Sequence, residues 1–213
     1  MNQPIVIAID GPVASGKTAV GRLLAQRLEY RFLDTGLLYR AITLLALESG
    51  LDLSDEQCLV KMANPLPFEV SFDDKGEVSL FASGRNIVPY VHSPEVAEAT
   101  SRVAVVLGVR MALLPLQRQI AEDGRVVMVG RDIGTVVVPK ASFKLYLTAS
   151  SEERTRRRYQ ELLNQGRSVE YGEVQEQLIQ RDYRDEKRAV APLRKAKDAK
   201  LLKTDGLTEI EVV

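Results

Sequence analysis

The stretch Gly11-Pro12-Val13-Ala14-Ser15-Gly16-Lys17-Thr18 decides how this chain folds. An apolar run at residues 5–9 precedes it, and a stretch that predicts a helix ending near residue 28 follows it. A strand, a G-x-x-x-x-G-K-T loop and a helix in this order form the P-loop, which binds phosphate groups. The glycines let the backbone turn tightly, and the N–H groups at the helix N-terminus attract anions. The alternative interpretation is a glycine-rich turn that only starts a helix.

The P-loop predicts a bound nucleoside triphosphate. We expect residues Gly11 to Ala19 to surround its phosphates, with the Lys17 ammonium reaching the outer ones. The Thr18 hydroxyl is the expected protein ligand of Mg²⁺. The P-loop does not identify the acceptor of the phosphoryl group, so the rest of the chain must indicate it.

Composition and charge exclude several other classes of protein. The 213 residues suit one domain, and 29 basic residues balance 29 acidic ones, which argues against bulk nucleic-acid binding. Cys58 and His92 are the single residues of their types, so we expect no internal disulfide and no cysteine-based zinc or paired-histidine metal site. Apolar runs stay below the roughly 18 residues of a membrane span, and we recognise no cleavable leader. We therefore expect a cytoplasmic protein without a membrane contact.

Short apolar runs alternate with helical patterns along the rest of the chain. We predict strands at residues 31–33, 126–129, 143–147 and 200–204, with helices between them. Residues 68–72 and 78–81 flank a turn and predict a hairpin, with residues 86–88 as a third short strand. The expected fold is a three-layer α/β/α P-loop core with a parallel sheet, helices on both faces and a small β-containing insertion.

Two polar clusters follow predicted strands, where ligands gather in open α/β sheets. Thr35 and Arg40 follow the second strand and could hold a second phosphate, or could be a helix cap and a surface arginine. Arg131 and Asp132 follow the strand at residues 126–129. An arginine there can bind a phosphoryl group, and the carboxylate can accept a hydrogen bond from a base amino group. The alternative is a purely structural ion pair.

Two helical regions supply further candidates. Ser101 and Arg110 would lie on opposite faces of one unbroken helix, but Gly108 permits a bend that could bring them to one site. The C-terminal third is rich in arginine, and Arg181, Asp185 and Arg188 are spaced to share one helical face. Cations there would neutralise charge on a transferring phosphoryl group. The alternative is a solvated charged face, especially for Arg156 and Arg157.

Taken together, these segments resemble the bacterial cytidylate kinases, which belong to the nucleoside monophosphate kinases. The most specific strings are Gly-Arg-Asp-Ile-Gly-Thr-Val-Val at residues 130–137 and Arg-Ala-Val-Ala-Pro-Leu at residues 188–193. Further matches are residues 9–17, Asp34-Thr35-Gly36 with Tyr39-Arg40, residues 93–96 and residues 150–154. The matching segments span nearly the whole chain.

The resemblance implies a role for each candidate residue in transfer of the γ-phosphoryl group of ATP to CMP or dCMP with Mg²⁺. Residues 11–18 would hold the ATP phosphates, and Arg154 and Arg158 would belong to a short helical lid over ATP. Thr35, Arg40, Arg131 and Arg188 would hold the CMP phosphate. Ser101, Arg110 and Asp132 would read cytosine, and Arg181 and Asp185 would contact the ribose or the phosphates. The expected catalytic set is Lys17, Arg131, Asp132, Arg181 and Arg188.

The resemblance also implies an organisation of the chain and a list of partners. Residues 1–213 would form one kinase domain, with an NMP-binding region at 36–107 that contains the insertion at about 66–90. The lid and the arginine-rich helices would occupy residues 151–188. We expect a monomer that binds small nucleotides and no nucleic acid.

Two departures from the family pattern bear on these roles, and two alternative functions stay open. Ala14 replaces a common glycine, which is tolerable if its φ is negative. His92 stands where an arginine is usual, which weakens a basic side chain near the monophosphate. The alternatives are a P-loop kinase for another acceptor such as UMP, and a non-enzymatic nucleotide-dependent module whose arginine-rich helices bind nucleic acid.

Overall fold

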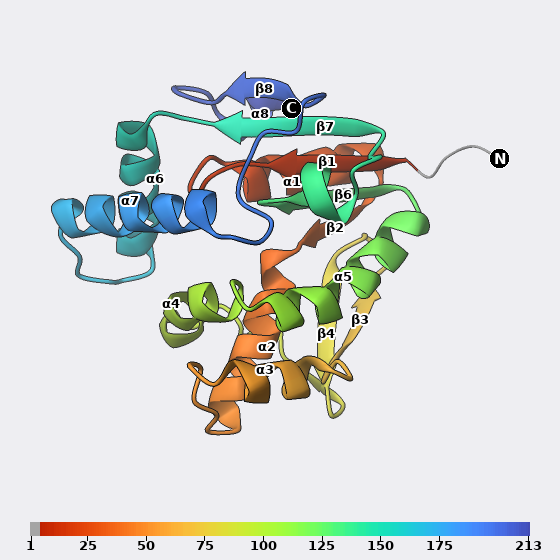
Figure 1. Cartoon of the computed structure of the whole chain (residues 1–213). Helices are drawn as coiled ribbons and strands as arrows, with labels where there is room; N and C mark the ends of the chain where they lie inside the picture. The colour runs from red at the N-terminus through yellow and green to blue at the C-terminus, as the bar shows by residue number, and fades with distance from the viewer. Residues whose placement is uncertain (1–4) are drawn as a thin grey trace.

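A five-stranded parallel sheet lies at the centre of the computed structural model, which describes residues 5–213 (Figure 1). The strand order is β2-β6-β1-β7-β8, so β1, which leads into the P-loop, lies between β6 and β7. In chain order the elements are β1 (Val6–Asp10), α1 (Lys17–Leu28), β2 (Arg31–Asp34), α2 (Gly36–Glu48), α3 (Glu56–Ala63), β3 (Glu69–Phe72), β4 (Val78–Ala82), β5 (Arg85–Asn86), α4 (Pro94–Val103), α5 (Leu107–Glu122), β6 (Val126–Gly130), η1 (Ile133–Val137), β7 (Phe143–Thr148), α6 (Ser151–Asn164), α7 (Tyr171–Lys187), β8 (Lys200–Lys203) and α8 (Glu209–Val212).

Alternate residues of β1 belong to two different cores, one on each face of the sheet. Ile7 and Ile9 pack with Val20 of α1, and Val212 of α8 covers the same cluster. Val6 and Ala8 belong to the larger cluster that α2 and α5 supply from the other face. Every residue of β1 and β6 is buried, as expected for parallel strands covered on both faces. The predicted three-layer α/β/α arrangement is confirmed.

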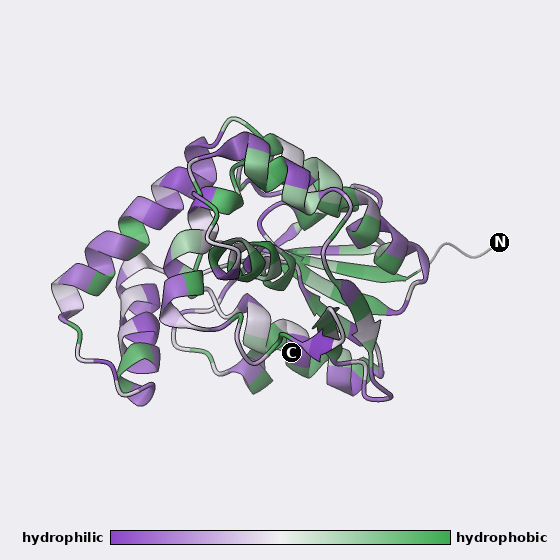
Figure 2. Ribbon diagram, turned by 90° about the horizontal axis from the view of Figure 1, so that it is seen from below, coloured by the Kyte–Doolittle hydropathy of each residue, from purple (hydrophilic) through white to green (hydrophobic). Residues whose placement is uncertain are grey.

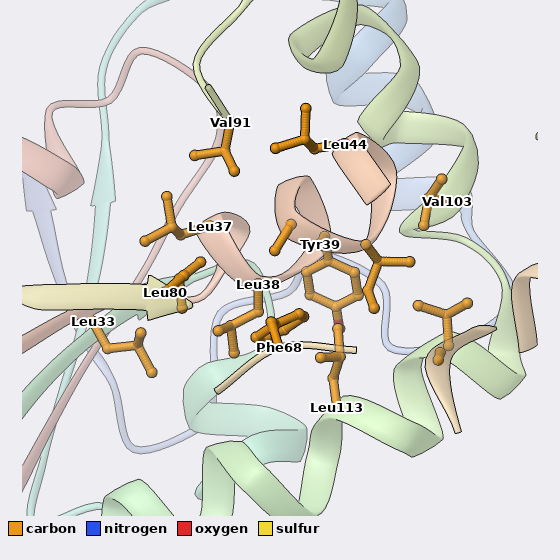
Figure 3. Close-up of a cluster of buried hydrophobic side chains, with 14 of the residues drawn as sticks. Leu33, Leu37, Leu38, Tyr39, Leu44, Phe68, Leu80, Val91, Val103 and Leu113 are labelled. Atoms are coloured by element: carbon orange, nitrogen blue, oxygen red, sulfur yellow. The ribbon is translucent and has the colours of Figure 1, made fainter. Parts of the chain in front are cut away.

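The insertion is a separate three-stranded antiparallel sheet, β3-β4-β5. Figure 3 shows its core, where Phe68 and Leu80 meet Leu38 of α2 and Leu113 of α5. The Gly76 carbonyl at the hairpin turn accepts a hydrogen bond from the Phe32 amide at 2.9 Å, which ties the insertion to β2. The hairpin prediction is confirmed, whereas the third strand, β5, lies at residues 85–86 and not at 86–88.

The bend between Ser101 and Arg110 is present, but it does not lie at Gly108 as the sequence suggested. α4 ends at Val103 and α5 begins at Leu107, and the two helices meet at 102°. Gly108 lies inside α5, where an added Cβ would come within 2.3 Å of Val60 on α3. This glycine therefore permits close helix packing and does not form the bend. Within residues 5–213, no single helix is long and apolar enough to cross a membrane; the bent α4–α5 pair passes that test by length and composition alone.

Two long polar helices, α6 and α7, stand to one side of the sheet (Figures 1 and 2). The two helices pack against each other, and each buries few apolar residues, such as Leu162 in α6 and Leu178 in α7. Tyr159 meets Tyr171 edge to face, with ring centroids 5.4 Å apart. In Figure 2 the ribbons of both helices, at the left of the view, carry mostly the colour of hydrophilic residues. Helices that are polar around most of their circumference are stabilised in part by side-chain ion pairs, such as Arg157 with Glu153 in α6.

Candidate active site

The P-loop joins β1 to α1 and leaves the first turn of α1 open to an anion. Gly16, at the N-cap with a φ of 87°, offers no side chain for capping, and the first turn carries no acidic residue. The Lys17 ammonium donates to the Pro12 carbonyl at 2.9 Å and closes the loop. Free amides at a helix N-terminus and a buried ammonium are the chemistry that binds polyphosphate. The residues present therefore fit the expected nucleoside triphosphate.

Ala14 does not adopt the negative φ that its methyl group would favour. Its φ is 57°, in the left-handed region. A non-glycine residue there costs about 1–2 kcal/mol, so the P-loop holds local strain at this position. The usual glycine would avoid this strain. The negative φ under which alanine would be tolerated here is not present.

Thr18 meets the carboxylate of Asp34, which was not among the expected metal ligands. Its hydroxyl donates to Asp34 Oδ2 at 3.0 Å, while Oδ1 of the same carboxylate accepts from the Gly36 amide at 3.0 Å. A hydroxyl and a carboxylate beside a phosphate-binding loop are the oxygen donors that Mg²⁺ prefers. The site thus fits the expected ion, with Asp34 added to Thr18.

Asp132 is the centre of a buried charge cluster beyond the end of β6. Its carboxylate binds Arg110 of α5 at 2.5 Å and Arg188 at the end of α7 at 3.2 Å. Asp132 and both arginine side chains are less than a tenth exposed. The Arg110 guanidinium also lies over the ring of Tyr39, 5.4 Å from its centroid. Elements far apart in the sequence thus place a donor and an acceptor side by side.

A second charge cluster connects α7 to the loop after β6. Arg131 Nε donates to Asp185 at 2.6 Å. Burial alone would raise the pKa of Asp185, but Arg131 and Arg181 hold it below its ordinary value. Burial and the neighbouring Arg131 lower the pKa of Arg181 to about 10.

Lys17 is close enough to this second cluster for the charges of the cluster to shift its pKa. Burial, followed by Arg131 and Arg181, lowers the pKa of Lys17 well below its ordinary value. The P-loop and the second charge cluster are therefore adjacent, and the excess of positive charge between them favours a bound anion.

One cleft of about 1320 Å³ joins the P-loop to both charge clusters. Residues Val13 to Ala19 line it, together with Thr35, Arg40, Ser101, Arg110, Arg131, Asp132, Arg158, Arg181, Asp185 and Arg188. Three expected site residues, Gly11, Pro12 and Arg154, are not among its lining residues. Gly11 packs closely against β7, because a Cβ at this position would lie 2.1 Å from the Leu147 carbonyl oxygen.

Two expected acceptor-site residues already have partners. The Thr35 hydroxyl donates its proton to the Val129 carbonyl at 3.0 Å, so it faces the cleft as an acceptor. Ser101 donates to the Glu98 carbonyl at 3.3 Å and accepts from Arg184 of α7 at 3.2 Å. The Ser101–Arg184 contact connects α4 to α7. Their expected contacts with a nucleotide stay predictions.

Comparison with known proteins decides the family. The family model described as cytidylate kinase matches residues 7–213. The chain is 44% identical to the cytidylate kinase of Carboxydothermus hydrogenoformans, over 97% of this chain and 93% of that one. It is 45% identical to that of Herpetosiphon aurantiacus, over 100% of this chain and 92% of that one. The chain belongs to the cytidylate kinase family. Among solved structures, the shikimate kinase of Bacteroides thetaiotaomicron is similar with a TM-score of 0.41 and 14% identity, covering 92% of this chain and 84% of that one.

In this member of the cytidylate kinase family, Arg154 is a buried side chain that connects several elements. Its guanidinium donates to the carbonyls of Ala149 and Val13 and pairs with Asp182 of α7 at 2.5 Å. Only 10% of the side chain is exposed. Arg154 therefore holds α6, α7 and the P-loop together, and the expectation that it reaches ATP from a lid does not fit this placement.

Arg157, for which a solvated charged face was the alternative interpretation, lies against the P-loop. Its guanidinium donates to the hydroxyl of Thr204 at 2.9 Å and to its carbonyl, while Thr204 in turn donates to the Ser15 carbonyl at 3.2 Å. A Cβ on Gly16 would lie 3.6 Å from Arg157 Nη1. Its i,i+4 partner Glu153 was visible in the sequence, but Thr204 is 47 residues away and gave no local signal.

Proposed function

We propose that this chain transfers the γ-phosphoryl group of ATP to CMP or dCMP, producing CDP or dCDP and ADP. The observation that carries the proposal is the single cleft that joins an uncapped P-loop helix to a buried arginine–aspartate cluster. Membership of the cytidylate kinase family supports the same reaction. A reaction between two substrates that are held side by side in one cleft becomes effectively unimolecular.

The transfer needs cations that follow the phosphoryl group. Lys17 and the P-loop amides would hold the ATP phosphates, and Arg131, Arg181 and Arg188 would neutralise charge on the group in transit. Arg131 and Arg181 are near enough to Lys17 to lower its pKa, after the larger effect of burial. Arginine contacts of this type are worth about 10³–10⁵ in rate. The proposal requires no covalent enzyme intermediate.

Mg²⁺ belongs to this proposal as a cofactor held by Thr18, with Asp34 beside it. The ion would neutralise negative charge on the β and γ phosphates. Asp34 also orients the loop before α2 through the Gly36 amide. Thr35 and Arg40 follow directly and line the cleft, where we propose that they hold the acceptor phosphate.

Recognition of cytosine is assigned to Ser101, Arg110 and Asp132. Cytosine offers an amino donor at N4 and acceptors at N3 and O2, which suit a carboxylate and an arginine held side by side. Asp132 and Arg110 are buried and paired, so their geometry is preorganised. Uracil would place an oxygen against Asp132, and an unpaired buried polar group costs about 1–3 kcal/mol. This difference favours CMP over UMP.

The remaining assignments describe the organisation of the enzyme. We propose one kinase domain with an acceptor-binding region at residues 36–107 and a lid with arginine-rich helices at residues 151–188. Arg158 lines the cleft and pairs with Glu161 at 2.8 Å. Its position on the cleft supports the proposal that it is the lid arginine that meets ATP. Lid closure would exclude water and prevent ATP hydrolysis. We also propose a cytoplasmic monomer that binds neither nucleic acid nor membrane.

A coupled assay of ADP production tests the reaction and the acceptor together. The enzyme is incubated with ATP, Mg²⁺ and each of CMP, dCMP, UMP, AMP and GMP. We expect strong signals with CMP and dCMP, a weak signal with UMP and none with the purine nucleotides. Activity with UMP or AMP alone would retain a P-loop kinase and contradict the roles of Arg110 and Asp132. No activity, together with salt-dependent nucleic-acid binding, would favour the non-enzymatic module.

Two variants separate the chemistry from base recognition. Lys17→Met should lose turnover and keep the fold, whereas the exposed Lys140→Met serves as a matched control with wild-type turnover. Asp132→Asn can donate to the oxygen of uracil, so the CMP-to-UMP ratio of kcat/KM should fall about 10-fold or more. A ratio that stays constant would contradict recognition through Asp132.

A further inference from the structure

His92 lies beside Arg40, a residue assigned to the acceptor phosphate, and both line the cleft. His92 precedes α4, and its neighbour Val91 is fully buried in the cluster of Figure 3 with Leu37 and Leu44 of α2. The backbone at residues 91–92 is therefore fixed against the helix that carries Arg40. The imidazole itself remains accessible from the cleft.

One nitrogen of Arg40 meets two acceptors in this segment. Arg40 Nη1 lies 3.4 Å from His92 Nδ1 and 3.5 Å from the Val91 carbonyl oxygen. A guanidinium has donors and no acceptor. His92 Nδ1 must therefore present its lone pair to Arg40, and the proton of the neutral ring must reside on Nε2.

The surrounding charges favour this neutral form. Burial and then the Arg40 cation lower the pKa of His92 below its ordinary value of 6.5. Asp34 of β2 raises it, and Arg22 of α1 lowers it further. The imidazole is thus uncharged at pH 7.5 and can act as an acceptor for Arg40.

We infer that His92 is a positioning residue for the acceptor phosphate: its neutral Nε2–H tautomer accepts a hydrogen bond from Arg40 and aims that guanidinium into the cleft. This inference rests on the proposed role of Arg40 in binding the monophosphate. Residues 91 and 92 hold Nη1, and no residue of the described range 5–213 hydrogen-bonds the other donors of this guanidinium, so these can meet phosphate oxygens. Loss of the acceptor should weaken binding of CMP and leave binding of ATP unchanged.

Kinetics of two variants test this function. His92→Leu removes the acceptor, and His92→Asn keeps an acceptor at the δ position that cannot be protonated. We expect His92→Leu to raise KM for CMP about 3–10-fold, the equivalent of one hydrogen bond, with kcat and KM for ATP within about twofold. His92→Asn should restore most of the CMP affinity. Equal effects of Leu and Asn, or a rise in KM for ATP of the same size, would overturn the inference.

A double-mutant cycle shows whether His92 acts through Arg40. In an Arg40→Leu background, His92→Leu should cause no further rise in KM for CMP, because the side chain that it positions is gone. An additional rise as large as in the wild type would overturn the inference, since His92 would then act on the substrate by itself.

A spectroscopic readout separates this inference from the proposed function. His92 is the single histidine of the chain, so nitrogen-15 NMR of the enzyme without a histidine tag reports one imidazole. At pH 7.5 we expect an unprotonated Nδ1 and a protonated Nε2, and a higher imidazole pKa in Arg40→Leu. The opposite tautomer, or a pKa that does not respond to Arg40→Leu, would overturn the inference. Inactivity of the wild type with CMP would instead overturn the proposed function and leave this result standing.

Discussion

Asp10 ends β1 directly before the P-loop and connects the two halves of the site. Its buried carboxylate accepts hydrogen bonds from the amides of Ile133 and Gly134, each at 2.8 Å. These amides follow Arg131 and Asp132, so Asp10 fixes the backbone that carries both side chains. Burial raises the pKa of Asp10 to about 6, with the Asp132 carboxylate adding to the rise and the two amides opposing it.

This raised pKa predicts a distinct pH dependence of stability. The folded chain binds the Asp10 proton more tightly than the unfolded chain, so the contribution to stability is complete below about pH 4 and declines as the pH rises to about 6. A shift of this size corresponds to about 2–3 kcal/mol. Asp10→Asn does not titrate, so the unfolding free energy of the wild type minus that of Asp10→Asn should fall from pH 4 to pH 7.

Urea unfolding of both proteins at several pH values measures this difference. Subtraction cancels the contributions of the other carboxylates, which both proteins share. A difference that is constant or that increases with pH would show that the amides of residues 133 and 134 hold the carboxylate ionised, against the effect of its burial.

Single residues also show what the sequence could and could not predict. Lys17 and Thr18 were predictable because the P-loop is a local pattern with a local geometry. The partner of Thr18 was not, because Asp34 reaches it only after β2 and α1 meet in the folded chain. The left-handed φ of Ala14 was missed because alanine rarely adopts it.

Helix α6 carries two arginines, Arg154 and Arg158, that were both expected to belong to a lid over ATP. Their surroundings differ. Arg154 is buried against Asp182, whereas the side chains of Arg158 and Glu161 are 28% and 53% exposed. Removal of one partner from a buried ion pair leaves an uncompensated charge and costs about 3 kcal/mol or more. An exposed pair contributes about 1 kcal/mol or less.

The two arginines should therefore separate in experiment. Arg154→Met should lower the unfolding free energy by about 3 kcal/mol, and Arg158→Met by less than about 1 kcal/mol. Arg158→Met should instead raise KM for ATP or lower kcat, because Arg158 lines the cleft. Chemical denaturation and steady-state kinetics of both variants check this pair of effects. Equal stability losses, or an ATP effect confined to Arg154→Met, would contradict the assignment.

Most elements were predictable from periodicity, because strands buried on both faces and amphipathic helices carry their pattern locally. The π-helix η1 at Ile133–Val137 was not predicted, since it depends on contacts from distant segments. Asp10 holds its first amides, and Arg118 of α5 donates to the carbonyls of Val136 and Val137 at 3.2 Å. The bend before α5 was predicted for the wrong residue, because a glycine can serve packing as well as turning.

Over the whole molecule the charges balance, but inside the cleft they do not. The chain has 29 basic and 29 acidic residues, whereas the cleft collects Lys17 and several arginines around fewer carboxylates. Burial, Arg131 and more distant cations lower the pKa of Arg181 to about 10. In the free protein the charged Arg181 is therefore destabilised by burial and by repulsion from Arg131, and a bound phosphate would offset both. Active sites often sacrifice stability for activity in this way.

Replacement of Arg181 tests whether this side chain lowers the stability of the free protein while it supports turnover. The lowered pKa means that the protonated guanidinium is less stable in the folded chain than in the unfolded one, and arginine is protonated in both at pH 7. Arg181→Gln should thus raise the unfolding free energy of the free protein by about 1 kcal/mol and lower kcat about 100-fold or more. Arg167→Gln, at an exposed position between α6 and α7, should change neither. If Arg181→Gln lost stability together with activity, attraction to Asp185 would outweigh the repulsion in the cleft.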